Sequence, residues 1–245
     1  MKAQAGIEIF RVLGRKMLAP YHRPEGRGGR RFPAVLFLHG FPGSEKSVDV
    51  QRELMSRGIA AIAPHFLGAW GSEGTYRFTT LVPQAQAALR AMRRLSFVDP
   101  RRVAVYGFSM GGWAALNLAA LEPGLKAVVA VAPAGGPEML GSGTRDFLKH
   151  LSRPLRVPKP SALLADFRRA VTLQDPALAV ARIQAPLLLI HGDADTTVPL
   201  AVSRRLASLA AGPVRLVVES GAEHALLDRR EAVARRVALW LAARL

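Results

Sequence analysis

The sequence predicts a mainly parallel α/β fold in which helices cover both faces of one central sheet. Short segments that are apolar throughout alternate along the chain with longer segments of helical periodicity. Continuous apolar strands are typical of a sheet that is buried on both faces, and the alternation implies crossovers between parallel strands. The 245 residues, half of them hydrophobic, suit a single domain over residues 1–245.

Six segments have the strand pattern, a short apolar run that ends at glycine, proline or polar residues. The first run ends at His39, and the third leads into Gly107. The expected strands are residues 33–38, 59–63, 102–106, 125–131, 186–190 and 214–218. Residues 7–18 are expected to add an antiparallel hairpin at one edge of the sheet.

Five segments have the apolar spacing of helices. In residues 79–95, for example, Leu81, Ala85 and Ala88 recur on one face with the 3.6-residue period. Gly58 is expected to end the preceding helix, residues 47–57. The expected helices are residues 47–57, 79–95, 111–121, 199–210 and 229–245.

Residues 135–182 interrupt the alternation of strands and helices. They hold no clear strand pattern and mix glycine, proline, basic residues and short apolar runs. Because an unstructured loop of this length is unusual in a compact domain, we expect a small helical cap. Its aromatic residues, Phe147 and Phe167, either line a small acyl pocket or only pack the cap onto the body of the protein.

The composition excludes several classes of protein. The chain has no cysteine, which excludes a disulfide framework, a cysteine nucleophile and thiolate metal sites. The N-terminal residues lack the apolar core and cleavage site of a signal peptide. No apolar run approaches the roughly 18 residues that a membrane span needs. We therefore expect a soluble, cytoplasmic protein.

The net charge of +16 raises the question of a polyanionic partner, because Lys+Arg number 34 against Asp+Glu 18. A nucleic-acid site requires basic residues gathered on one face, but here they are spread along the chain, mostly in pairs. The densest group is Arg23, Arg27, Arg30 and Arg31 in a glycine-rich loop. The distribution favours a solvated basic surface, with no nucleic-acid or membrane partner expected.

The segment Gly107-Phe108-Ser109-Met110-Gly111 carries the clearest chemical motif. It has the pattern Gly-x-Ser-x-Gly, and it follows an expected strand and opens an expected helix. This context is that of a nucleophile elbow, a strained turn that presents a serine hydroxyl. The motif occurs once in the chain. Ser109 is therefore the candidate nucleophile.

A serine hydroxyl needs a base to take its proton. The chain has six histidines, and His224 lies after the last expected strand and before the last expected helix. That position completes the chain order of serine, acid and histidine. We expect His224 to be the base, whereas His39 and His191, which end strands, are expected to shape loops or to make structural hydrogen bonds.

The acid should follow the preceding strand. Asp193 and Asp195 both lie directly after residues 186–190. We favour Asp195 as the residue that orients His224. Asp193 is the local alternative, and its structural role would be to hold the turn through backbone N–H groups.

An oxyanion hole needs two backbone N–H donors aimed at the developing charge. Met110, the residue after the nucleophile, is expected to supply one. The loop after the first expected parallel strand should supply the other, and Phe41 is assigned because Pro42 has no N–H.

These segments resemble the α/β-hydrolase superfamily, in the branch of dienelactone hydrolase-like esterases and prolyl-oligopeptidase-type or acylaminoacyl-peptidase-type catalytic domains. The resemblance covers nearly the whole chain and is carried by residues 39–43, 99–112 and 191–195. It implies that Asp195 rather than Asp193 is the acid. Residues 68–74 are similar to a loop that these enzymes place beside the active site, which makes Trp70 a candidate substrate contact.

Two departures from the family limit what the resemblance implies. Dienelactone hydrolases proper use a cysteine nucleophile, and this chain has none. The peptidases carry a propeller domain, for which 245 residues leave no room. The resemblance therefore bears on fold and reaction class more than on substrate.

The sequence thus predicts a serine hydrolase that cleaves a small carboxylic ester through an acyl-enzyme. Aminopeptidase or acyl-peptide hydrolase activity on short peptides is the alternative within enzymes. A polyanion-binding protein on a hydrolase scaffold is the alternative outside them. No phosphate loop, zinc helix or dinucleotide loop occurs in the sequence, so we expect no cofactor and no metal.

Overall fold

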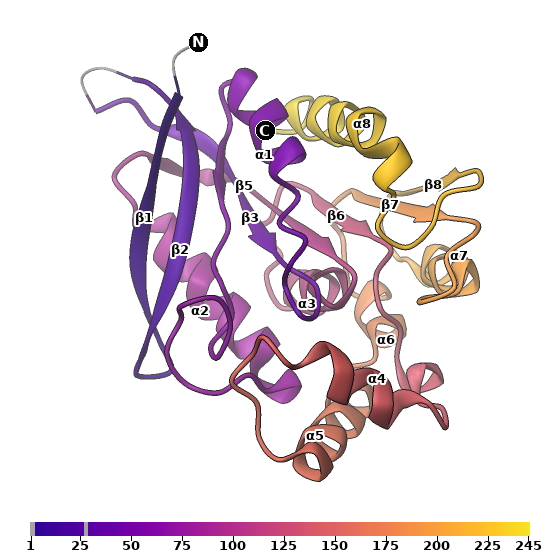
Figure 1. The fold of residues 1–245 in the computed structure, drawn as a ribbon. Coiled ribbons are helices and arrows are strands. Elements are labelled where there is room, and N and C mark those ends of the chain that lie inside the picture. The colour runs from indigo at the N-terminus through magenta and orange to yellow at the C-terminus, as the bar shows by residue number, and fades with distance from the viewer. Residues whose placement is uncertain (1–2, 27–28) are drawn as a thin grey trace.

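Buried apolar strands form the centre of the protein, as a computed structural model of residues 3–26 and 29–245 shows (Figure 1). These residues form an eight-stranded sheet in the order β1-β2-β4-β3-β5-β6-β7-β8. Every neighbouring pair from β4 to β8 is parallel, and β1 and β2 form an antiparallel hairpin at one edge. The strands are β1 (Ala3–Val12), β2 (Arg15–Pro24), β3 (Phe32–Leu38), β4 (Ala60–Ile62), β5 (Val98–Phe108), β6 (Val128–Val131), β7 (Leu187–Gly192) and β8 (Val214–Glu219).

Two hydrophobic clusters lie on opposite faces of the sheet. Alternate residues of β3 show the division, because Val35 and Phe37 join one cluster and Leu36 joins the other. Helices α1 and α8 cover the first face, and α2, α3, α6 and α7 cover the second (Figure 1). The predicted sheet with helices on both faces is confirmed. These helices are α1 (Val48–Ser56), α2 (Leu81–Arg93), α3 (Met110–Ala119), α6 (Pro176–Val180), α7 (Leu200–Leu209) and α8 (Arg230–Ala242).

Two of the predicted parallel strands begin three or more residues away from the observed start. β5 begins at Val98, whereas the apolar pattern begins only after Arg102. The added residues include Asp99 and Pro100, which are partly exposed, and Arg101, which is exposed, and all three break that pattern. β6 begins at Val128 rather than Leu125, because Leu125 is buried in the preceding turn.

Residues 135–182, all of which the structure describes, form short helices and no strand. α4 and α5 lie beyond the lower end of the sheet in Figure 1. They follow a loop that leaves the sheet at the carboxyl end of β6. The elements of this segment are a 3-10 turn (Pro137–Met139), α4 (Thr144–Leu151), α5 (Pro160–Leu173) and α6.

Helix α5 is fixed to the body of the protein by polar and aromatic contacts. Its Asp166 accepts hydrogen bonds from the N–H of Phe78 (2.6 Å) and the hydroxyl of Thr79 (2.5 Å), at the 3-10 turn Phe78–Thr80. The ring of Phe167 meets that of Phe78 edge-on, with centroids 4.8 Å apart. α5 is thus held against the residues that lead into α2.

In the described part of the chain, the helices are all too short or too polar to cross a membrane.

The Asp166 contacts predict a measurable contribution to stability. Asp166→Ala should lower the free energy of unfolding by about 1–3 kcal/mol, because it removes a charged partner from two donors. Arg168→Ala, an exposed position on the same helix, should change it by less than about 0.5 kcal/mol. Urea unfolding of the three proteins measures both effects. Equal effects of the two changes would contradict the assignment.

Candidate active site

Ser109 lies at the sharp turn between β5 and α3. Its backbone has φ 53° and ψ −120°, a conformation that costs energy for any residue with a side chain. The turn is possible because its flanking residues are glycines. A Cβ on Gly107 would lie 2.1 Å from the carbonyl oxygen of Gly111, and one on Gly111 would lie 1.9 Å from that of Leu38. The two glycines therefore allow the strand, turn and helix to pack closely.

His224 lies in the loop after β8, at the same carboxyl edge of the sheet as Ser109. Its Nε2 lies 2.9 Å from Ser109 Oγ, and its Nδ1 lies 2.7 Å from Asp195 Oδ2. A carboxylate can only accept, so Nδ1 carries the proton and Nε2 presents its lone pair to the serine hydroxyl. The imidazole is thus oriented as a base toward Ser109.

Asp195 follows β7, and its side chain has no exposed surface. Its Oδ1 accepts hydrogen bonds from the N–H groups of Thr197 and Val198, each at 2.8 Å. Burial by itself would raise the pKa of Asp195. Hydrogen bonds from His191, His224 and the Val198 N–H outweigh that effect and lower the pKa well below its usual range. The carboxylate is therefore ionised at neutral pH.

Asp193, the alternative acid, lies in a different environment. It is exposed, and its Oδ1 accepts a hydrogen bond from the N–H of Gly221 at 2.6 Å. This bond joins the loop after β7 to the loop that carries His224. The structure therefore brings Asp195, not Asp193, into contact with His224.

The loop after β3 lies against the nucleophile turn. A Cβ on Gly40 would come within 3.1 Å of both the Ser109 Cβ and the Phe108 carbonyl oxygen. Phe41, the next residue, packs its ring against Tyr76 and Phe78, with centroids 5.5 and 5.1 Å apart. Met110 begins α3, where backbone N–H groups lack partners within the helix. Both predicted oxyanion donors thus belong to segments that adjoin Ser109.

His39 holds the loop of Phe41 in place through two hydrogen bonds. Its Nδ1 donates to the Gly40 carbonyl oxygen (2.7 Å), and its Nε2 accepts from the Phe66 N–H (3.1 Å). Burial, with a smaller effect of the Lys46 charge, lowers the pKa of His39 to about 3. The ring is therefore neutral and holds the loop through hydrogen bonds, as expected for a loop-shaping histidine.

The three candidate substrate contacts lie in different environments. Trp70 is 40% exposed, and its Nε1 donates to the Pro42 carbonyl oxygen at 2.8 Å, so it lies beside the loop of Phe41. Phe147 on α4 is 46% exposed. Phe167 is buried and reaches the loop of Phe41 only through Phe78. Trp70 is therefore the one of the three with a direct contact to a predicted oxyanion loop.

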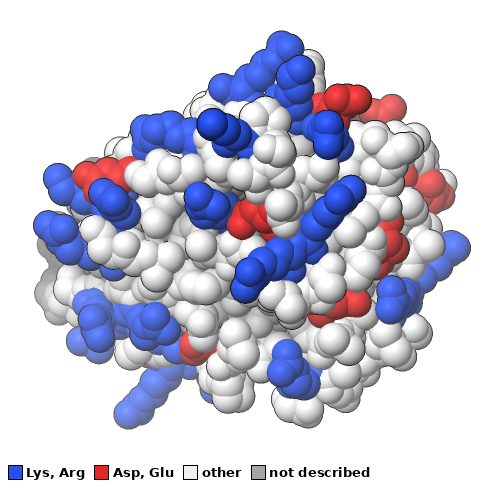
Figure 2. Space-filling view, turned by 90° about the horizontal axis from the view of Figure 1, so that it is seen from below, with Lys and Arg blue, Asp and Glu red and all other residues white. Residues whose placement is uncertain are grey.

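Figure 2 shows basic side chains spread over one face of the molecule, with acidic and uncharged side chains between them. In the basic group near the hairpin, Arg23 and Arg30 lie over the rings of Phe97 and Phe32. Arg27 of that group lies outside the described residues. Among the described residues, no three His, Asp or Glu side chains are arranged to hold a metal ion.

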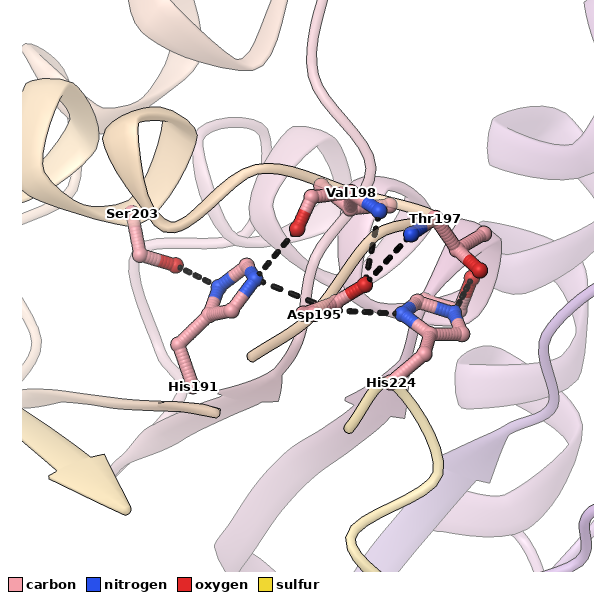
Figure 3. Close-up of polar contacts among 7 residues, drawn as sticks. His191, Asp195, Thr197, Val198, Ser203 and His224 are labelled. Atoms are coloured by element: carbon pink, nitrogen blue, oxygen red, sulfur yellow. Dashed lines mark hydrogen bonds and ion pairs between the residues drawn. The ribbon is translucent and has the colours of Figure 1, made fainter. Parts of the chain in front are cut away.

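The contact between His191 and Asp195 is not predicted from the sequence. His191 Nε2 lies 3.1 Å from Asp195 Oδ2, and both side chains are fully buried (Figure 3). The only sequence feature that could indicate this contact is that the two residues lie four positions apart, across the end of β7. That spacing alone does not show which way the histidine points.

Several known proteins are similar to this chain in sequence. The model of the prolyl oligopeptidase family matches residues 47–245. The protein Rv2307c of Mycobacterium tuberculosis strain H37Rv is 31% identical over 217 residues, 87% of this chain and 71% of that protein. The Bacillus subtilis protein named peptidase YtmA is 30% identical over 177 residues, 69% of this chain and 66% of that protein.

Solved structures show the same fold. The 2,6-dihydroxy-pseudo-oxynicotine hydrolase matches with a TM-score of 0.80 at 23% identity, over 98% of this chain and 68% of that chain. Est1E from Butyrivibrio proteoclasticus matches with a TM-score of 0.77 at 20% identity, over 98% of both chains.

The environment of Asp195 predicts a pH dependence of stability. Its folded-state pKa is lowered, so its contribution is fully present above the unfolded value of about 3.9 and is lost as the pH falls below it. The free energy of unfolding of the wild type should therefore fall more steeply below about pH 4 than that of Asp195→Asn. Urea unfolding at a series of acidic pH values measures this. Asp193→Asn, the control in the same loop, should retain the steep fall, and parallel curves for wild type and Asp195→Asn would contradict the prediction.

Proposed function

The chain belongs to the prolyl oligopeptidase family, and from this premise we propose that it hydrolyses small carboxylic esters through an acyl-enzyme on Ser109. Its relatives include a protein named peptidase YtmA and the putative esterase YitV, both of Bacillus subtilis, and its fold is that of α/β hydrolases, so the resemblance noted in the sequence is confirmed. The protein is therefore a hydrolase.

One observation carries the proposal, the continuous hydrogen-bonded chain from Ser109 through His224 to Asp195. As Ser109 Oγ bonds to the ester carbonyl carbon, its proton passes to His224 Nε2. Asp195 holds the Nδ1 tautomer and stabilises the imidazolium that forms. His224 then gives the proton to the departing alcohol oxygen, which leaves the acyl group on Ser109. Water attacks that ester by the same sequence and releases the acid.

The negative charge that develops on the carbonyl oxygen needs donors that are already in place. We assign the N–H groups of Phe41 and Met110 to this role. Support comes from the contact of Gly40 with Ser109 and from the position of Met110 at the start of α3. His39 and the Phe41 ring contacts would keep the first donor fixed.

Cleavage of short peptides is the second candidate, because the matching family is one of peptidases and one relative is named a peptidase. An amide needs more efficient protonation of its leaving nitrogen than an ester needs at its oxygen. A panel of p-nitrophenyl esters and aminoacyl amides separates the two. Higher kcat/KM on the esters supports the proposal, and higher kcat/KM on the amides supports the peptidase.

Residues 135–182 are proposed as the cap that governs substrate choice. The segment begins against the nucleophile, because the N–H of Ala134 donates to the Ser109 carbonyl oxygen at 3.0 Å. Farther along, Phe167 contacts Phe78, and Phe78 contacts Phe41. The cap therefore adjoins both the nucleophile turn and the loop with the assigned oxyanion donor.

A fluorophosphonate probe tests the nucleophile. It should label Ser109 and no other residue, because this serine alone has the base and the turn geometry. Ser109→Ala should lose labelling and ester turnover but remain folded, with a cooperative unfolding transition like that of the wild type. Peptide mapping of the labelled protein is the measurement. Labelling that persists in Ser109→Ala would show that the nucleophile is misassigned.

The acid is tested by two matched substitutions. Asp195→Asn should lower kcat on p-nitrophenyl butyrate by about ten-thousandfold, the effect of the wrong histidine tautomer in a serine protease triad. Asp193→Asn affects only the hydrogen bond from the Gly221 N–H, which it weakens because the amide oxygen carries no charge, so it should lose some stability and little turnover. Larger loss of turnover in Asp193→Asn than in Asp195→Asn would reverse the assignment.

The cap is tested with an acyl-length series of p-nitrophenyl esters. An apolar pocket predicts a preference for short-to-medium acyl chains, each buried methylene adding up to about 0.8 kcal/mol. Phe147→Ala and Phe167→Ala should change the profile of kcat/KM against chain length. Leu173→Ala, at an exposed position on α5, is the control.

Rates in this series should be normalised to the fluorophosphonate-reactive fraction, because truncation of buried Phe167 costs stability of about 3–5 kcal/mol. If neither phenylalanine variant alters the profile, these residues do not select the substrate.

A further inference from the structure

We propose that His191 and Ser203 form a positioning pair that holds the Asp195 carboxylate in the orientation that His224 needs. The inference rests on the proposed function, because it assigns a role in the same reaction. His191 is the last residue but one of β7, and Ser203 lies on α7. Neither residue contacts the serine nucleophile, so both would act through Asp195.

The pair is buried and densely hydrogen-bonded (Figure 3). His191 and Ser203 have no exposed surface. His191 Nδ1 lies 2.7 Å from Ser203 Oγ, and its Nε2 lies 2.8 Å from the Val198 carbonyl oxygen and 3.1 Å from Asp195 Oδ2. Every nitrogen of the ring thus faces a defined partner.

The partners fix the tautomer of His191. The Val198 carbonyl and the ionised Asp195 carboxylate can only accept hydrogen bonds, so Nε2 must carry a proton that both share. In the neutral ring, Nδ1 then has a lone pair that accepts the Ser203 hydroxyl proton. If Ser203 were absent, the buried Nδ1 would have no hydrogen-bond partner, and the ring would lose one restraint on its rotation. Ser203 therefore helps to keep Nε2–H directed at Asp195.

This donor completes the coordination of the carboxylate. Asp195 Oδ1 accepts two backbone N–H groups, and Oδ2 accepts His224 Nδ1–H and His191 Nε2–H. With two donors on each oxygen, the carboxylate cannot rotate without losing a hydrogen bond in a site without water-exposed surface. Oδ2 is thereby kept in line with His224.

The arrangement also has an electrostatic consequence. A hydrogen bond to an ionised carboxylate lowers its proton affinity. The His191 donor therefore weakens the attraction between the Asp195 carboxylate and a protonated His224. Without that donor, the imidazolium of His224 would be more stable. The acid limb of kcat/KM, which reports protonation of the base in the free enzyme, would then move to higher pH. Asp193, another carboxyl group in the same loop, accepts a hydrogen bond from the Gly221 N–H and so is directed at a group outside this network.

Three variants test the pair on p-nitrophenyl butyrate. His191→Leu removes all three hydrogen-bond contacts of the ring, and His191→Gln can place an amide N–H near the position of Nε2. Ser203→Ala removes only the hydrogen-bond partner of His191 Nδ1 and leaves a small side chain in the core. The controls are His22→Leu, another histidine on the sheet, which bonds Gln51, and Ser208→Ala, an exposed serine on α7.

The expected results separate positioning from structural support. His191→Leu should lower kcat per reactive serine by about tenfold or more, the usual effect of removing a supporting partner of a site residue, with KM little changed. Its acid limb should move to higher pH, and His191→Gln should restore much of both properties. Ser203→Ala should show a smaller loss in the same direction. The controls should keep the wild-type kcat and the wild-type acid limb of the pH profile.

Counting active sites with the fluorophosphonate probe removes any effect of unfolded protein. The inference is overturned if the folded, reactive fraction of His191→Leu and of Ser203→Ala keeps the wild-type kcat, or if the acid limb of these variants is unmoved or moves to lower pH. If His191→Leu does not fold, Ser203→Ala decides the question by the same criteria. A second readout is the downfield proton resonance of His224 Nδ1–H, which should shift in Ser203→Ala and stay in Ser208→Ala.

Failure of the proposed function would look different. In that case the wild type itself would neither react with the probe at Ser109 nor turn over the ester, and the inference would fall with it. A reactive wild type with unaffected His191 and Ser203 variants would overturn only the positioning role.

Discussion

Asp195 is a carboxylate without exposed surface, and a charge in that position is stable only when hydrogen bonds replace the water that it has lost. The backbone N–H groups of Thr197 and Val198 supply two of these bonds, and two histidines supply the others. The loop after β7 must therefore fold tightly around the carboxylate. The need to satisfy one buried charge fixes where His224 lies, and through it the orientation of the Ser109 hydroxyl.

That arrangement requires backbones to approach one another closely at the carboxyl edge of the sheet. Gly107 and Gly111 allow β5, the turn and α3 to pack around Ser109. Gly192 has the same role between the acid and histidine loops, since a Cβ there would lie 2.0 Å from the Ala222 carbonyl oxygen. Ordinary side chains at these positions would separate the loops. The parallel order of β5, β7 and β8 brings the loops to one edge, and the glycines let them meet.

Much of this could be predicted from the sequence, because the signals are local. Strands buried on both faces are continuous apolar runs, and the turn around Ser109 needs glycines on both sides. The family resemblance and the chain order then supply His224 and Asp195. The first residues of β5 could not be predicted, because Asp99, Pro100 and Arg101 interrupt the apolar pattern, and of this stretch only Val98 pairs with β3, across a register shift.

The remaining features depend on contacts between distant segments. Nothing in the local pattern indicates that His191 turns toward Asp195 and Ser203, since the direction of its ring is set by packing between β7 and α7. The two cap aromatics have similar sequence contexts, yet Phe147 is exposed and Phe167 is buried against Phe78. Burial of such residues is decided by how α4 and α5 dock, which the sequence pattern alone does not encode.

Ester cleavage through an acyl group held on Ser109 is tested most directly by rapid mixing with p-nitrophenyl butyrate, acid quenching and peptide mass spectrometry. The wild type should give a burst of p-nitrophenol and a butyryl group on the peptide that contains Ser109, and both should be absent in Ser109→Ala. Ester turnover in the wild type with no acylated Ser109, or with the acyl group on another residue, would contradict this mechanism.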